Sequence, residues 1–277
     1  MAAVLHRVSR SLGRAREAGL MIGGLAADMP TRRALLEIYA NLGRTDRYGE
    51  VFDLNLRLNG RVFPARLRLG DIFVLGEILI DRQYELKTPL SSVSVVVDAG
   101  ANIGASALWF ASRFPSARLH AFEPAAGNFA LLEANLAGLP GATPYRMALG
   151  RAEGEITLHR GASEATHSII AGAPDLTADG IESVPLTTLA AHMAMAALPR
   201  IDLLKLDVEG AEMEVLIGLG ERIRDVGVIV GELHETIVDA ATFYGFLKDA
   251  GFRLVAKTAF REGDVTGVHG FEVARGP

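Results

Sequence analysis

The sequence contains no cysteine. This absence excludes disulfide bridges, thiolate metal sites and a cysteine nucleophile, and it fits a cytoplasmic location. A long apolar run is also missing, since no stretch approaches the ~18 residues that a membrane-spanning helix needs. Basic residues are not in excess, because 28 lysines and arginines stand against 33 acids, a formal net charge of −5. A general grip on nucleic acid needs clustered lysine and arginine, so the composition speaks against a nucleic-acid partner.

The most informative stretch runs from Val93 to Gly104. Its first half is a β-branched run, which predicts a strand buried on both faces of a parallel sheet. Asp98 and Gly100 follow, and a helical pattern begins after Gly104, which is the layout of a nucleotide-binding β-α unit. A dinucleotide fingerprint would also need glycine at position 102, where this chain has Asn102. S-adenosylmethionine carries no phosphate, so a site for this cofactor tolerates asparagine there.

A second short apolar run ends at Glu123 and Pro124. Glu123 follows Gly100 at about the ~20-residue interval at which such folds place the acid that binds ribose hydroxyls. An ionised carboxylate suits this task because it accepts two hydrogen bonds at once. A third run ends near Met147 and Ala148, and a small residue with accessible backbone there suits the edge of an adenine ring.

From Val93 onward, short apolar runs alternate with helical patterns. This alternation predicts an α/β fold, a mostly parallel sheet with helices on both faces. Helices are expected near 104–113, 125–137, 188–198, 210–219 and 236–250, and strands near 93–98, 118–123, 142–148, 154–159, 201–206, 226–231, 252–257 and 268–274. The polar segment 161–183 is expected to be a loop over the site. Ligands of such sheets bind beyond the carboxyl ends of the strands, which directs attention to the residues after each strand.

The first part of the chain has a different pattern, so we predict an accessory helical and hairpin region over 1–90 and a cofactor-binding domain over 91–277. Asn59 and Gly60 are a strong hairpin signal between two alternating runs. Tyr84 lies shortly before the first core strand and is expected to contact the cofactor or the acceptor. The exposed hairpin and helices of the accessory region offer a surface for a homodimer.

Two later strand ends carry acids and a histidine. Asp207 directly follows a buried strand, and its carboxylate is expected to face the ligand crevice. Glu212 and Glu214 are explained by the start of the next helix, whose positive end favours anions. Glu232 and His234 alternate along the following strand, so both side chains leave it on one face. A single histidine is more often structural than catalytic, but His234 shares a strand end with Glu232, beside Asp207.

With these motifs in place, the chain resembles the FkbM-type family of S-adenosylmethionine-dependent methyltransferases. The matching pieces are Val97-Asp-Ala-Gly-Ala-Asn-Ile-Gly104, Ala121-Phe-Glu-Pro124, Asn128, Leu132 with Asn135, Met147-Ala-Leu-Gly150, Ser168, Thr188-Leu189, Leu204-Lys-Leu-Asp-Val-Glu-Gly-Ala-Glu212, Val215-Leu216 and Glu232-Leu-His234. The resemblance runs from about Asp71 to Val273 and leaves the first part uncovered. Ala190 is a departure, because family members often carry aspartate after the Thr-Leu pair.

The resemblance implies a class I methyltransferase (Rossmann-like) fold that binds S-adenosylmethionine and releases S-adenosylhomocysteine. It implies that the turn formed by Asp98, Gly100, Ala101, Asn102, Ile103 and Gly104 lies beneath the methionine part. Glu123 would bind the ribose, Asn128 and Ser168 would add contacts, and Asp207 would lie near the sulfonium. Members of the family mostly methylate hydroxyls of natural products and sugars, so a small-molecule acceptor is implied. The identity of that acceptor does not transfer with the resemblance.

An aliphatic hydroxyl is a poor nucleophile until its proton leaves, so a general base helps. His234 is the best-placed candidate, with Asp207 to orient it and Glu232 to hold the ring or to compete for the role. A metal-assisted alternative would use Asp207, Glu209, Glu232 and His234 around Mg²⁺. A nicotinamide-dependent oxidoreductase, which would need the missing glycine at position 102, and a catalytically idle cofactor-binding scaffold also stay open. The Asp/Asn-Pro-Pro-aromatic motif of base-modifying methyltransferases is absent, which again disfavours nucleic acid as the substrate.

Overall fold

The structure is a computed structural model that describes residues 13–161, 176–259 and 267–276. The chain divides into two compact units, Met1–Gln83 and Tyr84–Pro277. This division comes earlier in the chain than the boundary that we placed after residue 90. Tyr84, expected to lie in the accessory region, is therefore the first residue of the second unit.

The first unit contains helices and one β-hairpin. Its elements are the π-helix η1 (Met21–Leu25), α2 (Met29–Ala40), the 3-10 helix η2 (Thr45–Arg47), β1 (Val51–Leu58), β2 (Arg61–Arg68), the 3-10 helix η3 (Leu69–Asp71), α3 (Ile72–Leu75) and the π-helix η4 (Gly76–Ile80). The two strands pair antiparallel, with Leu58 opposite Arg61, which leaves Asn59 and Gly60 as a two-residue turn. Alternate side chains of β1 are buried, as expected for a strand with one face on a core. The predicted hairpin is confirmed.

The second unit is built on a seven-stranded sheet in the order β11-β12-β10-β9-β3-β4-β5. Its strands are β3 (Val95–Ala99), β4 (Arg118–Phe122), β5 (Ala142–Tyr145), β9 (Ile201–Leu206), β10 (Val226–His234), β11 (Phe252–Ala259) and β12 (Val268–Arg275). The pairs from β10 through β9, β3 and β4 to β5 are parallel. β12 runs antiparallel to both β10 and β11. The sheet is therefore mostly parallel, as predicted.

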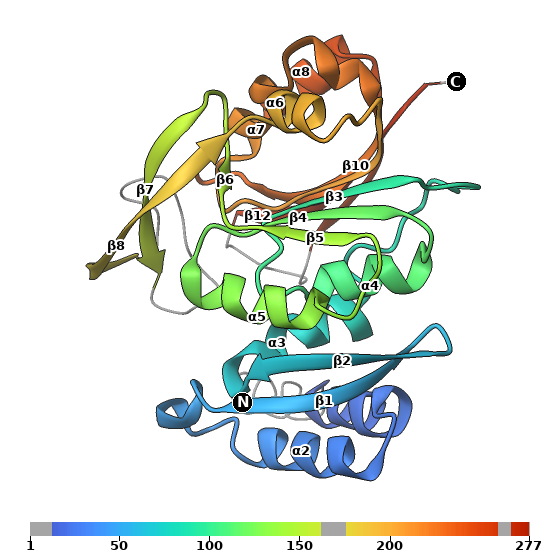
Figure 1. Ribbon diagram of the computed structural model, residues 1–277, viewed down its shortest axis with the longest axis vertical. Coiled ribbons are helices and arrows are strands. Elements are labelled where there is room, and N and C mark those ends of the chain that lie inside the picture. The colour runs from blue at the N-terminus through green and yellow to red at the C-terminus, as the bar shows by residue number, and fades with distance from the viewer. Residues whose placement is uncertain (1–12, 162–175, 260–266, 277) are drawn as a thin grey trace, which may run out of the picture. The chain divides into compact units, whose positions relative to one another are not determined.

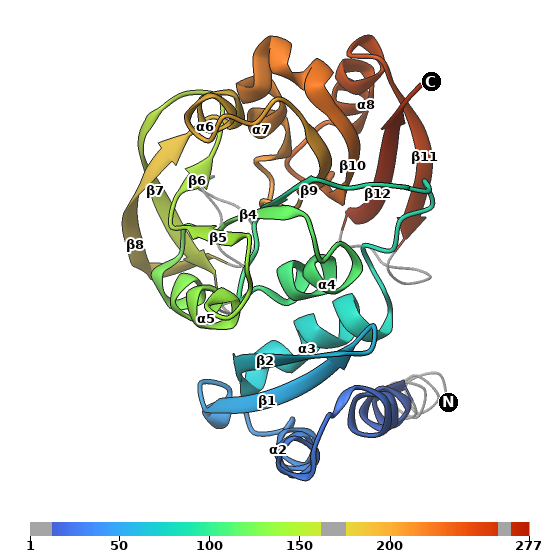
Figure 2. The same ribbon diagram turned by 45° about the vertical axis from the view of Figure 1, so that its right-hand side comes forward.

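Helices cover both faces of this sheet. α4 (Ala105–Arg113) and α5 (Ala126–Leu136) lie on one face, and α6 (Leu189–Met195), α7 (Glu212–Leu219) and α8 (Ala240–Asp249) lie on the other (Figures 1 and 2). All five residues of β3 are buried as a result. This double cover explains why β3 reads as an unbroken apolar run rather than an alternating one. The predicted α/β, Rossmann-like fold class is confirmed.

A small second sheet has the order β6-β8-β7, built from β6 (Ala148–Leu149), β7 (Gly154–Gly161) and β8 (Leu176–Thr187). We expected residues 161–183 to be a loop, and β8 corrects that prediction over its own length. β8 pairs antiparallel with β7, placing Ser183 opposite Thr157. A strand with one solvated face keeps many polar residues, so its sequence is easily taken for a loop. Within the described residues, no helix is both long and apolar enough to cross a bilayer.

Candidate active site

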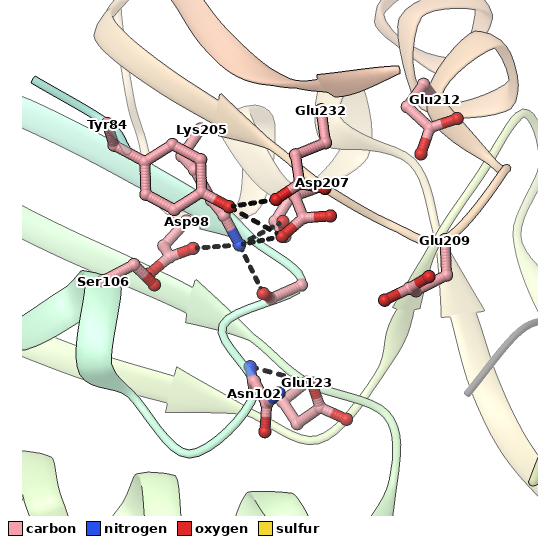
Figure 3. Close-up of polar contacts among 12 residues, drawn as sticks. Tyr84, Asp98, Asn102, Ser106, Glu123, Lys205, Asp207, Glu209, Glu212 and Glu232 are labelled. Carbon is pink, nitrogen blue, oxygen red and sulfur yellow. Dashed lines mark hydrogen bonds and ion pairs between the residues drawn. The ribbon is translucent and has the colours of Figure 1, made fainter. Parts of the chain in front are cut away.

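The candidate site lies at the carboxyl ends of β3, β4, β9 and β10. The strand order reverses beside β3, since β4 continues the chain on one side of it and β9 lies on the other. Open α/β sheets bind their ligands at such a switch point. Of the side chains predicted from the sequence as site residues, Asp98, Glu123, Asp207 and Glu232 come from these strand ends, and Tyr84 comes from the segment before β3 (Figure 3).

The turn after β3 packs directly against the end of β9. The backbone N–H of Asp207 donates to the carbonyl of Ala99 at 3.2 Å. Gly100 has a φ of +77°, and a Cβ built on it would lie 1.8 Å from the carbonyl oxygen of Asp207. Only glycine fits this position, for its left-handed backbone and for the close approach. The turn is thus held where a ligand over β3 would meet backbone rather than side chains.

Glu123 and Asn102 are joined across neighbouring strand ends. The N–H of Asn102 donates to Glu123 Oε2 at 3.0 Å (Figure 3). The N–H of Ala125 donates to Glu123 Oε1 at 2.9 Å. Burial raises the pKa of Glu123 to about 7, although these two N–H groups and the side chain of Asn128 oppose the rise. Among the described residues, the buried Oδ1 of Asn102 has no hydrogen-bond partner. A buried acceptor without a partner indicates a place where a ligand donor fits.

Lys205 is a site residue that the sequence motifs did not single out. Its side chain is 2% exposed, and its ammonium lies 3.3 Å from Asp98 Oδ1 and 3.3 Å from Asp207 Oδ2. The ammonium also donates to the carbonyl oxygen of Gly100 at 2.5 Å. Burial alone would lower the pKa of Lys205, but the carboxylates of Asp98 and Asp207 outweigh it and raise that pKa. The signal in the sequence was a lysine inside an apolar strand, because lysine is almost never buried without a partner.

Tyr84 bridges two carboxylates. Its hydroxyl donates to Asp207 Oδ2 at 2.8 Å and lies 3.4 Å from Glu232 Oε1 (Figure 3). Burial, followed by the charge of Asp207, raises the pKa of Glu232 well above its ordinary value. The structure therefore brings together the predicted side chains of Tyr84, Asp207 and Glu232. The carboxyl group of Glu232 holds its proton more tightly than an ordinary carboxyl does.

The surroundings of His234 differ from those that we expected. Its Nδ1 lies 2.9 Å from Glu212 Oε1, and its Nε2 lies 3.2 Å from Glu209 Oε2. Burial alone would lower the pKa of the ring, but hydrogen bonds to Glu209 and Glu212 outweigh it and raise that pKa to about 11. A ring that keeps both protons is a poor general base at neutral pH, so this geometry disagrees with the role that we predicted for His234. Glu212, which we had assigned only to a helix start, is one of its two partners.

The same cluster was our alternative metal site. Asp207, Glu232 and His234 each offer a ligand atom, and these atoms lie within 4.8 Å of one another. A metal-bound histidine must present an unprotonated ring nitrogen. Glu212 could keep its contact with Nδ1, but Nε2 would have to lose the proton that Glu209 favours before it could bind a metal. We therefore assign no metal ligands here.

The remaining predicted residues differ in their surroundings. Asp98 is fully buried and accepts a hydrogen bond from Ser106 Oγ at 2.6 Å, so it supports the turn from within. Ala101, Ile103 and Gly104 are also buried, and Gly104 is the N-cap residue of α4. Pro124 follows β4 and is partly exposed.

The predicted adenine contacts lie after β5, which ends at Tyr145, earlier than we expected. The N–H of Met147 donates to the Tyr145 carbonyl at 3.0 Å. Ala148 begins β6 and belongs to a buried apolar cluster with Ala125, close in sequence to Glu123. Ser168 lies outside the described residues.

Comparison with known proteins gives one family. A family model described as "Methyltransferase FkbM domain" matches residues 98–254. "Methyltransferase 1" of Beauveria bassiana is 31% identical over an alignment of 207 positions, and the match covers 67% of this chain and 82% of that protein. The "31-O-demethyl-FK506 methyltransferase FkbM" of Streptomyces tacrolimicus is 32% identical over an alignment of 240 positions, and the match covers 73% of this chain and 90% of that protein.

Among solved structures, the precorrin-6y C5,15-methyltransferase of Geobacter metallireducens aligns with a TM-score of 0.42 and 17% identity. That alignment covers 73% of this chain and 88% of the other. The matched family segment begins at Asp98, at the glycine turn, and continues past His234. It therefore includes the carboxyl ends of β3, β4, β9 and β10, where the candidate site lies.

Proposed function

Because the chain belongs to the FkbM methyltransferase family, we propose that it transfers a methyl group from S-adenosylmethionine to a hydroxyl of a small molecule. The observation that carries this proposal is the meeting of the Gly100 turn with the carboxylate of Glu123 at two neighbouring strand ends. Bound S-adenosylmethionine would supply a methyl group that its sulfonium charge already activates.

The residues of the turn fit this cofactor. A carboxylate has about four acceptor positions, and the bonds that Glu123 makes with Asn102, Ala125 and Asn128 fill at most three of them. The carboxylate can therefore accept a further hydrogen bond, as a ribose hydroxyl would require. The buried Oδ1 of Asn102, which has no partner in the described part of the chain, supplies an acceptor for a second donor of the ligand.

The charges of the site also fit a cationic ligand. Lys205 is paired with Asp98, and His234 is paired with Glu212. Asp207, Glu209 and Glu232 add three more carboxyl groups at the same edge of the sheet. A buried carboxylate is stabilised by a positive charge close to it. The excess of acids therefore supports a ligand with a positive centre, such as a sulfonium.

The proton of the acceptor hydroxyl must leave during methyl transfer, and a protein group can take it. Of the three catalytic residues that we predicted, we favour Glu232 as this base. Its carboxyl lies beside Asp207 and near the hydroxyl of Tyr84. Because its pKa is raised, Glu232 would be a stronger base than an ordinary carboxylate in the fraction of molecules in which it is ionised. Asp207 is held by Lys205 and Tyr84, which suits an orienting and charge-balancing role.

A hydroxyl of a small molecule is supported by the relative from Streptomyces tacrolimicus, whose name describes a methyltransferase for an O-demethylated form of FK506. The chain covers most of that relative's length, so its kind of acceptor is a reasonable guide. The cytoplasmic location, the homodimer and the absence of a nucleic-acid partner stay predictions from the sequence.

The test begins with the donor. Isothermal titration calorimetry of the full chain should show heat with S-adenosylmethionine and with S-adenosylhomocysteine, and no comparable heat with NAD or NADP. A panel of macrolide, sugar and simple aliphatic alcohols, assayed with methyl-labelled S-adenosylmethionine, should then give labelled ethers. Tight nicotinamide binding without S-adenosylmethionine binding would overturn the proposal, and labelling only on nitrogen or carbon would overturn the choice of a hydroxyl.

A further inference from the structure

His234 lies at the carboxyl end of β10, between the carboxylates of Glu209 and Glu212. We propose that His234 is a positioning residue, which holds the Glu209 carboxylate on the acceptor side of the site and affects methyl transfer only through Glu209. By the acceptor side we mean the edge formed by the ends of β9 and β10, as distinct from the ends of β3 and β4, which we assign to the cofactor. The inference rests on the proposed methyltransferase function.

The contacts of its ring argue against His234 as the base that takes the acceptor's proton. A carboxylate offers acceptors only, so a ring nitrogen that faces it donates a proton. Both nitrogens of His234 face carboxyl groups, at 2.9 Å and 3.2 Å, and this geometry favours the doubly protonated ring. Asp207 lies close to it as well, and its charge favours the same protonation state. A cation with both N–H groups engaged cannot take up a further proton.

The two carboxylates that flank the ring are not equivalent. Glu212 is 0% exposed, and its Oε1 also accepts the N–H of Gly210 at 2.9 Å, so it is an anchor within the fold. The side chain of Glu209 is 36% exposed. The ring thus connects the buried Glu212 to Glu209, which reaches the surface of the site. This arrangement lets His234 hold the Glu209 carboxylate in place.

The backbone at Glu209 has an unusual conformation that must be held by its surroundings. Glu209 has a φ of +53°, in the left-handed region that residues with a side chain rarely adopt. Gly210 follows with a φ of +97°, where a Cβ would lie 2.6 Å from Ile237 Cδ1. Strained backbone persists only where its surroundings hold it. The contacts of His234 with Glu209 and of Glu212 with the Gly210 N–H hold this turn at two consecutive residues.

Glu209 exposes more of its side chain than Asp207 or Glu212 does, so it is the more accessible to an acceptor. Asp207 is engaged by Lys205 and Tyr84. Glu232 interacts electrostatically with Glu209, so the proposed base and the presented carboxylate are neighbours. A hydrogen bond to Glu209 from another polar group of the acceptor would orient the reacting hydroxyl, and methyl transfer depends strongly on orientation.

The first experiment measures the protonation state of the ring. Two-bond ¹H–¹⁵N spectra of the full chain, recorded from pH 5 to pH 9, are compared with those of His234→Gln to assign the His234 signals. We expect the doubly protonated pattern to persist above pH 8. His269→Gln is the matched control, since His269 is also buried at a strand end but lies beside Glu235 and Tyr244, and its pKa is lowered, mainly by burial. A neutral His234 ring at pH 7 would overturn the inference, whether or not an acceptor is known.

The second experiment is a double-mutant cycle with His234→Gln, Glu209→Gln and the double variant, using the most active alcohol of the acceptor panel. Each single variant should lower kcat/KM for the alcohol roughly tenfold, mainly through KM, and the double variant should lose no more than about twofold beyond the worse single variant. Independent losses that multiply to ~100-fold would contradict the inference. Glu209→Gln removes only the exposed end of the arrangement, so it keeps the test valid if His234→Gln folds poorly.

The two proposals fail differently. A wild-type chain that binds no S-adenosylmethionine and methylates no alcohol contradicts the proposed function. A wild-type chain that does both, but whose His234 ring is neutral or whose cycle is multiplicative, contradicts only the role of His234. Affinity for S-adenosylhomocysteine should change less than about threefold in all three variants, because they alter the acceptor side and not the ends of β3 and β4.

Discussion

The ammonium of Lys205 donates a hydrogen bond to the carbonyl oxygen of Gly100, so a side chain from β9 fixes the glycine turn after β3. The same ammonium is paired with Asp98 and Asp207. Because the Lys205 ammonium contacts the glycine turn and both acids, the geometry at the ends of β3 and β9 depends on this side chain. A buried charge left without its partner is strongly destabilising.

We therefore expect Lys205→Met to lower the free energy of unfolding by ~3–5 kcal/mol. Urea unfolding followed by circular dichroism measures this change. Lys257→Met is the matched control, since Lys257 is paired with Glu235 and its side chain is 47% exposed, and exposed ion pairs contribute less than ~1 kcal/mol. Equal losses in the two variants would contradict the structural role of Lys205.

The second prediction concerns cofactor affinity. Glu123→Gln should weaken S-adenosylhomocysteine binding at least about tenfold, because a charge-assisted hydrogen bond contributes ~1.5–3 kcal/mol. Glu133→Gln, a change of an exposed acid on α5, should have no effect. Calorimetry gives both dissociation constants. An unchanged value for Glu123→Gln would show that this carboxylate does not bind the ribose.

The third prediction concerns the pH dependence of stability. Burial raises the pKa of Glu123 from 4.5 to about 7 in the folded chain. Its protonated form is therefore favoured by folding, and this contribution is present below pH 4.5 and is lost as the pH rises to about 7. Glutamine at position 123 cannot ionise, so Glu123→Gln does not lose this contribution. Between pH 5 and pH 8, the free energy of unfolding of the variant should therefore rise relative to that of the wild type. Urea unfolding measures both free energies, and a difference between them that stays constant over this pH range would contradict the pKa shift.

Much of this site was predictable because its residues follow buried strands. Asp98, Glu123, Asp207 and Glu232 each come at or just after the end of a strand, and parallel strands bring their carboxyl ends to one edge. The predicted fold class and the methyltransferase family are both confirmed.

The surroundings of His234 were not predictable. Its ring lies between Glu209 and Glu212, which belong to another segment and reach it through a left-handed turn. Periodicity does not reveal which way such a turn directs its side chains. The strand β8 was missed for a related reason, since a polar strand is recognised by its partner and not by its own pattern.

The fourth prediction concerns metal dependence. We assigned no metal ligands to Asp207, Glu232 and His234, because both ring nitrogens face carboxylates. Methyl transfer to an alcohol should therefore keep its rate within several-fold after treatment with EDTA, with a buffer exchange as the control. A loss of activity that added Mg²⁺ restores would favour metal-assisted methyl transfer instead.

The last prediction separates the two candidate bases. If Glu232 takes the proton of the acceptor hydroxyl, Glu232→Gln should lower kcat by ~10²–10⁴. The base must be ionised to accept a proton, and burial and Asp207 raise the pKa of Glu232. The wild-type rate should therefore rise with pH at a midpoint above the ordinary carboxylate value of ~4.3, and Glu232→Gln should lack this rise.

Glu235→Gln is the matched control for Glu232→Gln. Glu235 directly follows the same strand, but its side chain is partly exposed and paired with Lys257 and His269. This variant should keep both the rate and the pH profile of the wild type. His234→Gln should lose activity through KM and should keep the rise with pH, because it disturbs the presentation of Glu209 and leaves the base in place. If the rise disappeared in His234→Gln and persisted in Glu232→Gln, the proton would pass through the imidazole, and the assignment to Glu232 would be wrong.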